Sequence, residues 1–146
     1  YNARFGDPEA MNVLSLLESD FIDICEGIAE GNINSVNIKF TKKASVCKYA
    51  VPLGYPDNPI KGKEINVSKV KNTAGLFYAS VNAVNNKVVL AGSRAVAVVA
   101  VEDSISLAEN IAEKEICSID GPLFHRKDIG KDFLIQKRVD HMVSIR

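Results

Sequence analysis

The sequence predicts an α+β domain in which helices flank a small, mostly antiparallel β-sheet or barrel. Apolar residues recur every three or four positions before residue 31 and again after residue 103, as on one face of a helix. Between these segments apolar residues alternate with polar ones, and turn residues separate the alternating stretches. A run of strands between helices, without regular strand–helix alternation, is typical of the α+β class.

The composition is that of a folded domain without a charge bias. Of the 146 residues, 47% are hydrophobic and 25% are charged, which fits one domain of ordinary size or one domain with part of a neighbour. Eighteen basic residues balance eighteen acidic ones, which excludes a strong electrostatic attraction to bulk nucleic acid or anionic membranes, but not a local phosphate pocket. The longest apolar run, residues 95–101, is too short to span a membrane.

The first element is predicted to be one continuous helix between residues 7 and 31. Asp7 can cap the free N–H groups at its start, Pro8 suits the first turn, and Gly31 ends the helix. The apolar stripe that supports a single helix consists of Leu14, Leu17, Phe21, Ile24, Cys25 and Ile28.

The middle of the chain is predicted to form strands. They are expected over residues 36–40, 44–53, 76–84, 87–91 and 95–101. The glycines and prolines of residues 54–62 indicate a loop, and Asn85-Asn86 indicates a tight hairpin turn. Small and β-branched residues dominate the last strand, which is therefore expected to be covered on both faces.

Two further helices are predicted after the strands. Asp103 or Ser104 can cap the first of them, and Asp120-Gly121-Pro122 ends the region that follows. The last helix is indicated by the apolar residues Phe133, Leu134, Val139, Met142 and Val143.

The cysteines and histidines form no recognisable metal motif. Cys25, Cys47 and Cys117 are isolated, and neither His125 nor His141 has a cysteine at zinc-site spacing. The cysteines are expected to be small buried residues in a reduced compartment, and His125 to lie at the surface. Because the sequence starts without a hydrophobic signal-peptide segment, the protein is expected to be cytoplasmic.

Two segments have the residue types that bind phosphate. If residues 1–5 form a strand, Asn2 and Arg4 share one face, where an amide oxygen suits Mg²⁺ and a guanidinium neutralises phosphate oxygens. On composition alone, the favoured interpretation of residues 1–9 is a capped strand-to-helix turn. In the second segment, Arg126 or Lys127 could meet a phosphate, or Asp128 could pair with Arg126 as an internal strut, and charge neutrality favours the strut.

These segments match a known pattern. Residues 2–9, NARFGDPE, closely resemble the signature of the glycinamide ribonucleotide synthetase (phosphoribosylamine–glycine ligase) family of ATP-grasp ligases. The similarity continues in family order through residues 44–46, 54–56 and 61–62, then 91–94 and 124–130. It thus covers nearly the whole chain.

The resemblance implies roles for individual residues. Asn2 would be a ligand of the Mg²⁺ or Mn²⁺ that bridges the phosphates of ATP, together with a glutamate two positions before it, outside this sequence. Arg4 would be catalytic, stabilising the transferred phosphoryl group or the acyl phosphate. Asp7 and Glu9 would shape the substrate side of the site, and Arg126 and Lys127 are the candidates for the ribose phosphate.

The resemblance also implies the reaction and the domain organisation. The family uses ATP to activate glycine as glycyl phosphate, which the amine of 5-phosphoribosylamine attacks to give glycinamide ribonucleotide in purine biosynthesis. Residues 1–33 would be the strand-and-helix end of the ATP-grasp domain, and residues 34–146 the C-terminal domain. Without the upstream domains the chain alone is expected to be inactive. The alternative is a free-standing, non-catalytic α+β module for binding or interaction.

Overall fold

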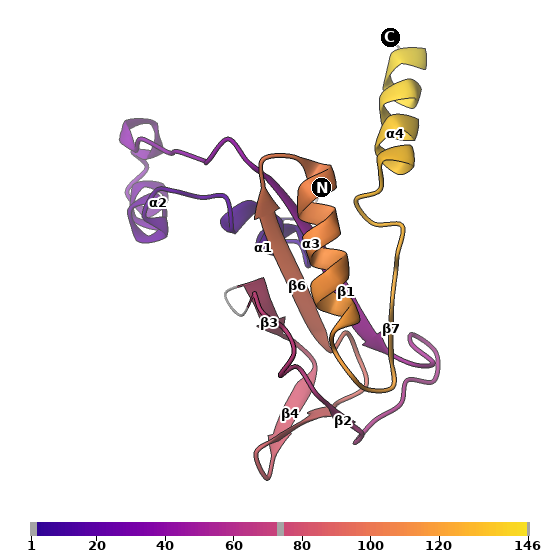
Figure 1. Cartoon of the computed structure of the whole chain (residues 1–146). Helices are drawn as coiled ribbons and strands as arrows, with labels where there is room; N and C mark the ends of the chain where they lie inside the picture. The colour runs from indigo at the N-terminus through magenta and orange to yellow at the C-terminus, as the bar shows by residue number, and fades with distance from the viewer. Residues whose placement is uncertain (1–2, 73–74, 146) are drawn as a thin grey trace.

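The computed structural model describes residues 3–72 and 75–145, which form two antiparallel sheets with helices around them (Figure 1). The larger sheet has the order β3 (Leu76–Tyr78), β6 (Val96–Glu102), β1 (Ala44–Pro52) and β7 (Leu123–His125). The smaller sheet has the order β2 (Glu64–Ile65), β5 (Lys87–Leu90) and β4 (Val81–Val84). Each of these strand pairs is antiparallel, which confirms the predicted α+β class.

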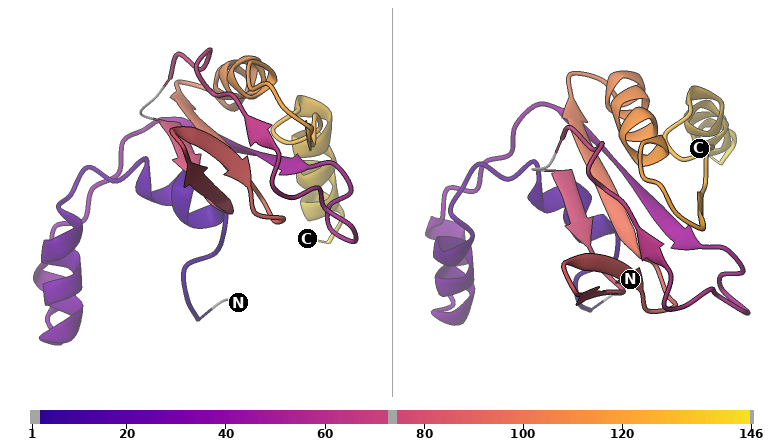
Figure 2. Two further views of the ribbon diagram at one scale, coloured as in Figure 1. Left: turned by 90° about the horizontal axis from the view of Figure 1, so that it is seen from below. Right: turned by 60° about the horizontal axis from the view of Figure 1, so that its bottom comes forward.

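The long antiparallel pair of β1 and β6 forms the centre of the domain. Its register runs from Ala44 opposite Glu102 to Ala50 opposite Val96. Residues 96–100 of β6 are all buried, so this strand is covered on both faces as predicted. Helix α3 (Ile105–Cys117) covers one face of the sheet and the short helix α1 (Glu9–Leu14) the other (Figure 2).

Alternation along β1 divides its side chains between these two faces. Val46 packs with Ala108 and Ala112 of α3, and Lys48 reaches the same helix. Cys47 packs instead with Met11 of α1.

The prediction of one continuous N-terminal helix is wrong. The stretch between residues 7 and 31 contains α1 and a separate helix α2 (Phe21–Ala29). Between them Leu17 forms a bridge with Phe40, and the Asp20 side chain accepts a hydrogen bond from the backbone N–H of Ile22. Because Asp20 caps a new helix and Leu17 pairs with a distant segment, the apolar stripe is shared between two helices. The predicted end of the helical region near Gly31 is confirmed, because α2 ends at Ala29 and Gly31 has a left-handed φ of 70°.

Three other local predictions are also corrected. No strand occurs in residues 3–8, and residues 1–2 lie outside the described part of the chain. Asp7 does not cap α1, because its carboxylate binds other side chains. Residues 36–40 follow a 3₁₀ turn, η1 (Ile33–Ser35), and form no strand beyond the single bridge at Phe40.

The remaining strands follow the prediction with two differences. Asn85 and Asn86 have positive φ angles of 49° and 62° and form the predicted turn between β4 and β5. Residues 76–84 divide into β3 and β4 because the chain passes from one sheet to the other. Strands β2 and β7 were not predicted, since two or three residues are too few to show a pattern.

The last helix, α4 (Asp132–Ser144), forms where it was predicted, but it buries no residue. In Figure 1 it extends beyond the sheet, and α2 stands apart on the other side. Among the helices of the described ranges, none has the length and apolar character needed to cross a membrane.

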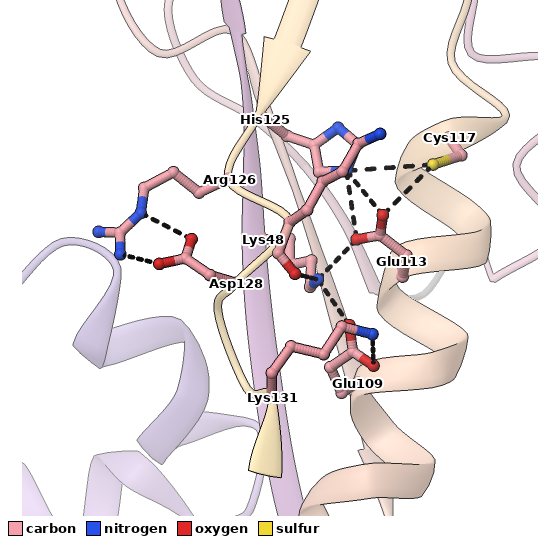
Figure 3. A network of polar contacts seen from close by, with 9 residues as sticks. Lys48, Glu109, Glu113, Cys117, His125, Arg126, Asp128 and Lys131 are labelled. Atoms are coloured by element: carbon pink, nitrogen blue, oxygen red, sulfur yellow. Dashed lines mark hydrogen bonds and ion pairs between the residues drawn. The ribbon is translucent and has the colours of Figure 1, made fainter. Parts of the chain in front are cut away.

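A buried lysine connects the central strand to α3 and to the segment that follows β7 (Figure 3). The Lys48 side chain has no exposed surface, and its ammonium donates to Glu109 Oε1 at 2.7 Å and to Glu113 Oε2 at 2.6 Å. It also donates to the backbone carbonyl of Lys127 at 3.3 Å. One ammonium group thereby satisfies acceptors from two elements that are distant in the sequence.

Two further contacts attach residues 125–131 to α3. Lys131 Nζ lies 2.7 Å from Glu109 Oε2, and His125 Nε2 lies 3.1 Å from Glu113 Oε1. Gly130 lets the chain approach this closely, because its φ is 80° and a Cβ there would lie 3.0 Å from Cγ of Glu109. The glycine predicted as a break is therefore also a close-packing position.

The ionised state of this network is favoured in spite of burial. Burial opposes the charge on Glu113, but hydrogen bonds from Lys48 and His125 outweigh it and lower the pKa of Glu113 to about 2. Burial likewise opposes the charge on Lys48, and its two carboxylate partners nevertheless raise the lysine pKa above its usual value. The pKa of Glu109 is lowered because Lys131 and Lys48 together outweigh its desolvation.

We expect Lys48→Met to destabilise the domain by about 3 kcal/mol, because it removes one of the two ammonium partners of the Glu109 carboxylate, which is 3% exposed. The matched control is Lys87→Met, which breaks the surface pair with Glu64 and should cost less than about 1 kcal/mol. Urea unfolding of both variants measures the difference. Equal losses would contradict a special role for the buried lysine.

We also expect the domain to lose stability as the pH falls from about 4.5 toward 2. The folded-state pKa of Glu113 is lowered from 4.5 to about 2. Its contribution to the free energy of unfolding is therefore complete above about pH 4.5 and is lost progressively as the pH falls through about 2. Glu113→Gln should flatten the slope of unfolding free energy against pH near about pH 3 by up to about 1.4 kcal/mol per pH unit. The exposed carboxylate variant Glu64→Gln is the control and should change this slope little. An unchanged slope in Glu113→Gln would count against the network.

Candidate functional site

A cavity of about 720 Å³ lies beside β1, with Pro8 and Asn12 of the N-terminal segment in its lining. Its lining combines distant segments: Pro8 and Asn12, residues 45–47, 49 and 51 of β1, Tyr55-Pro56, Arg94, Ile105, residues 124–126, 129–130 and 135. Several of these segments carry the family-like motifs of the sequence. The fold therefore brings separate motifs to one cavity of a size typical of small-molecule sites.

Arg94 holds the N-terminal segment against this cavity. Its guanidinium lies 3.0 Å from Asp7 Oδ2 and donates to the backbone carbonyl of Asp7 at 3.1 Å. The same group stacks over the ring of Tyr49, 5.3 Å from its centroid. The Tyr49 hydroxyl donates to Asp7 Oδ1 at 2.8 Å. Asp7 is thus fixed by one residue of β1 and one that precedes β6.

The tyrosine and cysteine beside this cavity are held in their neutral forms. Burial, followed by the hydrogen bond with Asp7, raises the pKa of the Tyr49 hydroxyl. Burial and the nearby carboxylates of Asp7 and Glu9 raise the pKa of Cys47 to about 12. Cys47 is therefore an inert buried thiol, as the sequence predicted, and not a nucleophile.

Arg126 also lines the cavity and is oriented by Asp128. Its Nε donates to Asp128 Oδ1 at 3.0 Å and its Nη2 to Oδ2 at 2.6 Å, a two-point contact (Figure 3). The pair is exposed, with 67% and 38% of the two side chains accessible. The hydrogen bonds lower the pKa of Asp128 and raise that of Arg126. The two residues pair as the strut interpretation requires, but at the surface and not inside the domain.

One residue that lines this cavity carries a buried acceptor without a partner among the described residues. Oδ1 of Asn12 is buried and receives no hydrogen bond from any described residue, and Asn12 lines the cavity. A buried acceptor of this kind is normally satisfied by water or a ligand. The cavity thus offers two guanidinium groups and a free amide oxygen.

The other predicted site residues lie outside this cavity. Arg4 is exposed and donates to the neighbouring carbonyl of Phe5 at 2.7 Å, and Glu9 is exposed at the start of α1. Lys127 lines a smaller adjoining cavity of about 240 Å³. Asn2 lies outside the described residues.

Three residues of the cavity were not predicted as site residues. Arg94 stands in a motif that the sequence analysis recognised, but nothing near it in the chain indicates its partner Asp7. Tyr49 and Asn12 belong to a strand and a helix whose patterns indicate only burial. Only Tyr49 has a signal in the sequence, because alternation along β1 places it with Cys47 on the α1 face.

Comparisons with known proteins show which family the chain resembles. Residues 45–132 match the family model described as phosphoribosylglycinamide synthetase, C domain. The chain is 51% identical over 146 residues to the phosphoribosylamine–glycine ligase of Methanosarcina barkeri, matching 100% of this chain and 34% of that protein. It is also 51% identical, over 149 residues, to the same enzyme of Methanocaldococcus jannaschii, again 100% of this chain and 34% of the relative.

A solved structure is similar as well. The crystal structure of the phosphoribosylamine–glycine ligase from Thermotoga maritima superimposes with a TM-score of 0.72 at 25% identity, covering 88% of this chain and 32% of that one. The chain spans about a third of the length of the ligases that it matches. With this match over more than half of its residues, the chain belongs to the phosphoribosylglycinamide synthetase C-domain family.

Proposed function

We propose that the chain is the C-terminal part of a phosphoribosylamine–glycine ligase, which joins glycine to 5-phosphoribosylamine at the expense of ATP in cytoplasmic purine biosynthesis. The support is the match of the whole chain to enzymes of that name. In the complete enzyme ATP phosphorylates the glycine carboxylate, and the amine of phosphoribosylamine displaces phosphate from the resulting glycyl phosphate. The part of the protein described above contributes residues to the substrate side.

The observation that carries this proposal is the charge of the large cavity. Its ionisable lining includes two guanidinium groups, of Arg94 and Arg126, and no carboxylate. The carboxylates of Asp7 and Asp128 pair with these guanidinium groups and are not among the residues that line the cavity. A cavity with cationic groups held in place suits an anionic small molecule, and phosphoribosylamine carries a phosphate. We therefore assign Arg126, with Lys127 beside it, to the ribose phosphate.

Residues 1–33 are proposed to belong to the ATP-grasp domain, with residues 34–146 forming the C-terminal domain. Helix α2 supports this division, because Phe21, Ile22 and Ile28 are 40%, 64% and 63% exposed although the helix has an apolar face. An apolar face left uncovered is expected to pack against another part of the complete protein. On this division Asp7 and Glu9 join the two domains at the substrate side.

Asn2 and Arg4 are proposed to act on ATP. An amide oxygen at residue 2 suits Mg²⁺ or Mn²⁺, and a bound divalent ion would neutralise charge on the phosphates. Arg4 is exposed, with its guanidinium accessible to an incoming phosphoryl group.

In the complete ligase, Arg4→Lys should lower kcat at saturating ATP by about tenfold or more, because an ammonium cannot replace a planar fork of donors. Steady-state kinetics with an unchanged melting temperature tests this. The control is Arg138→Lys, the same change at an exposed position of α4, which should leave kcat unchanged. A normal rate for Arg4→Lys would exclude the assigned role.

Arg126→Ala should raise the KM for phosphoribosylamine by about tenfold while leaving the KM for ATP unchanged, because a charge-assisted hydrogen bond to the phosphate is lost. Asp128→Ala frees the guanidinium and should have a smaller effect on the same KM. Arg138→Ala is the matched control. If Arg126→Ala lowers only the melting temperature, the residue is a surface strut and does not bind substrate.

A further inference from the structure

A second cluster of reactive side chains lies next to the buried lysine, at the end of α3. Glu113 and Cys117 occupy positions i and i+4 of the helix, so both project toward β7, where His125 faces them (Figure 3). The expectation that His125 is a surface residue without a partner is therefore wrong, since its side chain is only 12% exposed. Cys25 and Cys117 were expected to be buried, and both are exposed.

We propose that Glu113, Cys117 and His125 form a binding site for one zinc ion. A carboxylate, a thiolate and an imidazole are the three ligand types that zinc prefers in proteins. No sequence motif indicates this site, because the cysteine and the histidine are eight residues apart, with a turn and a strand between them.

The distances between the three ligand atoms fit a tetrahedral site. His125 Nε2 lies 3.1 Å from Glu113 Oε1, Cys117 Sγ lies 3.7 Å from that oxygen, and Sγ lies 4.0 Å from Nε2. Zinc bonds of about 2.3 Å to sulfur and about 2.0–2.2 Å to nitrogen and oxygen require separations of about 3.4–3.6 Å. Shifts of a few tenths of an ångström would bring all three atoms to bonding distance.

The residues around the cluster have the features of a metal site. Lys48 holds the other oxygen of Glu113 at 2.6 Å, which leaves Oε1 aimed at the histidine and cysteine. A zinc ion would balance the charges of the thiolate and the Glu113 carboxylate. Lys48 and Lys131 would then share the carboxylate of Glu109, which contacts both ammonium groups. The position at the C-terminal end of α3 also favours a cation.

A fourth ligand has room and access. Cys117, His125 and Lys127 line the smaller cavity of about 240 Å³, which can hold a water molecule. Three protein ligands with one open position form an accessible site rather than a closed structural one. Because β7 and α3 each supply ligands, bound zinc would also hold the segment after residue 122 against the helix.

Cobalt titration of the 146-residue chain tests the proposal, since Co²⁺ substitutes for Zn²⁺ and reports its ligands. A tetrahedral site predicts visible d–d bands and a thiolate-to-metal charge-transfer band, both abolished by added Zn²⁺. Cys117→Ser should remove the charge-transfer band and weaken Zn²⁺ binding in calorimetry by at least tenfold. The matched control is Cys25→Ser, another exposed cysteine, on α2, which should behave as the wild type.

Circular dichroism shows whether each variant is folded, so that a loss of metal binding can be distinguished from a loss of structure. Cys117 is exposed at the last helical residue, so its serine variant should keep the wild-type fold. His125→Ala is the second variant and should weaken Zn²⁺ binding to a similar extent. The proposal is overturned if the wild type shows no thiolate charge-transfer band, or if that band survives in Cys117→Ser or disappears in Cys25→Ser. A folding failure of Cys117→Ser leaves the wild-type spectrum and the Cys25→Ser spectrum to decide.

Discussion

The structure depends on the burial of one charged group in the middle of its central strand. The Lys48 ammonium is removed from water and must find its acceptors within the protein, because an unpaired buried charge costs several kcal/mol. Two of the acceptors are carboxylates on successive turns of α3, and the third is a backbone carbonyl after β7. Satisfying this lysine therefore sets where α3 lies on the sheet and where the chain returns after residue 125.

Alternation along β1 supplies side chains both to this network and to the large cavity. Even-numbered side chains meet α3, whereas Cys47 and Tyr49 face α1 and the cavity. The motif after β7 crosses between the two sides: His125 and the carbonyl of Lys127 join the network, while Arg126 reaches the cavity. The buried lysine thereby positions a binding residue without touching the site itself.

The edges of the domain are less complete than its centre. Helices α2 and α4 leave apolar side chains exposed, including Ile28 at 63% and Val143 at 71%. The sheet with α1 and α3 already has a closed core of small and β-branched residues. These two helices thus contribute little to that core, in agreement with a chain that matches only a third of its longer relatives.

The sequence by itself determined the α+β class, the long strands β1 and β6, the Asn85-Asn86 hairpin and the helices α3 and α4, because their periodic patterns extend over enough residues to be read locally. The family resemblance followed from short ordered motifs. Tertiary structure alone decided that the N-terminal helix breaks at Leu17, since the bridge to Phe40 competes with the helix. It also decided the partners of Arg94, Lys48 and His125, because each meets residues that no local pattern relates to it. Charge and ligand chemistry are visible residue by residue, but which groups share a site depends on strand register and on the helix face that the core selects.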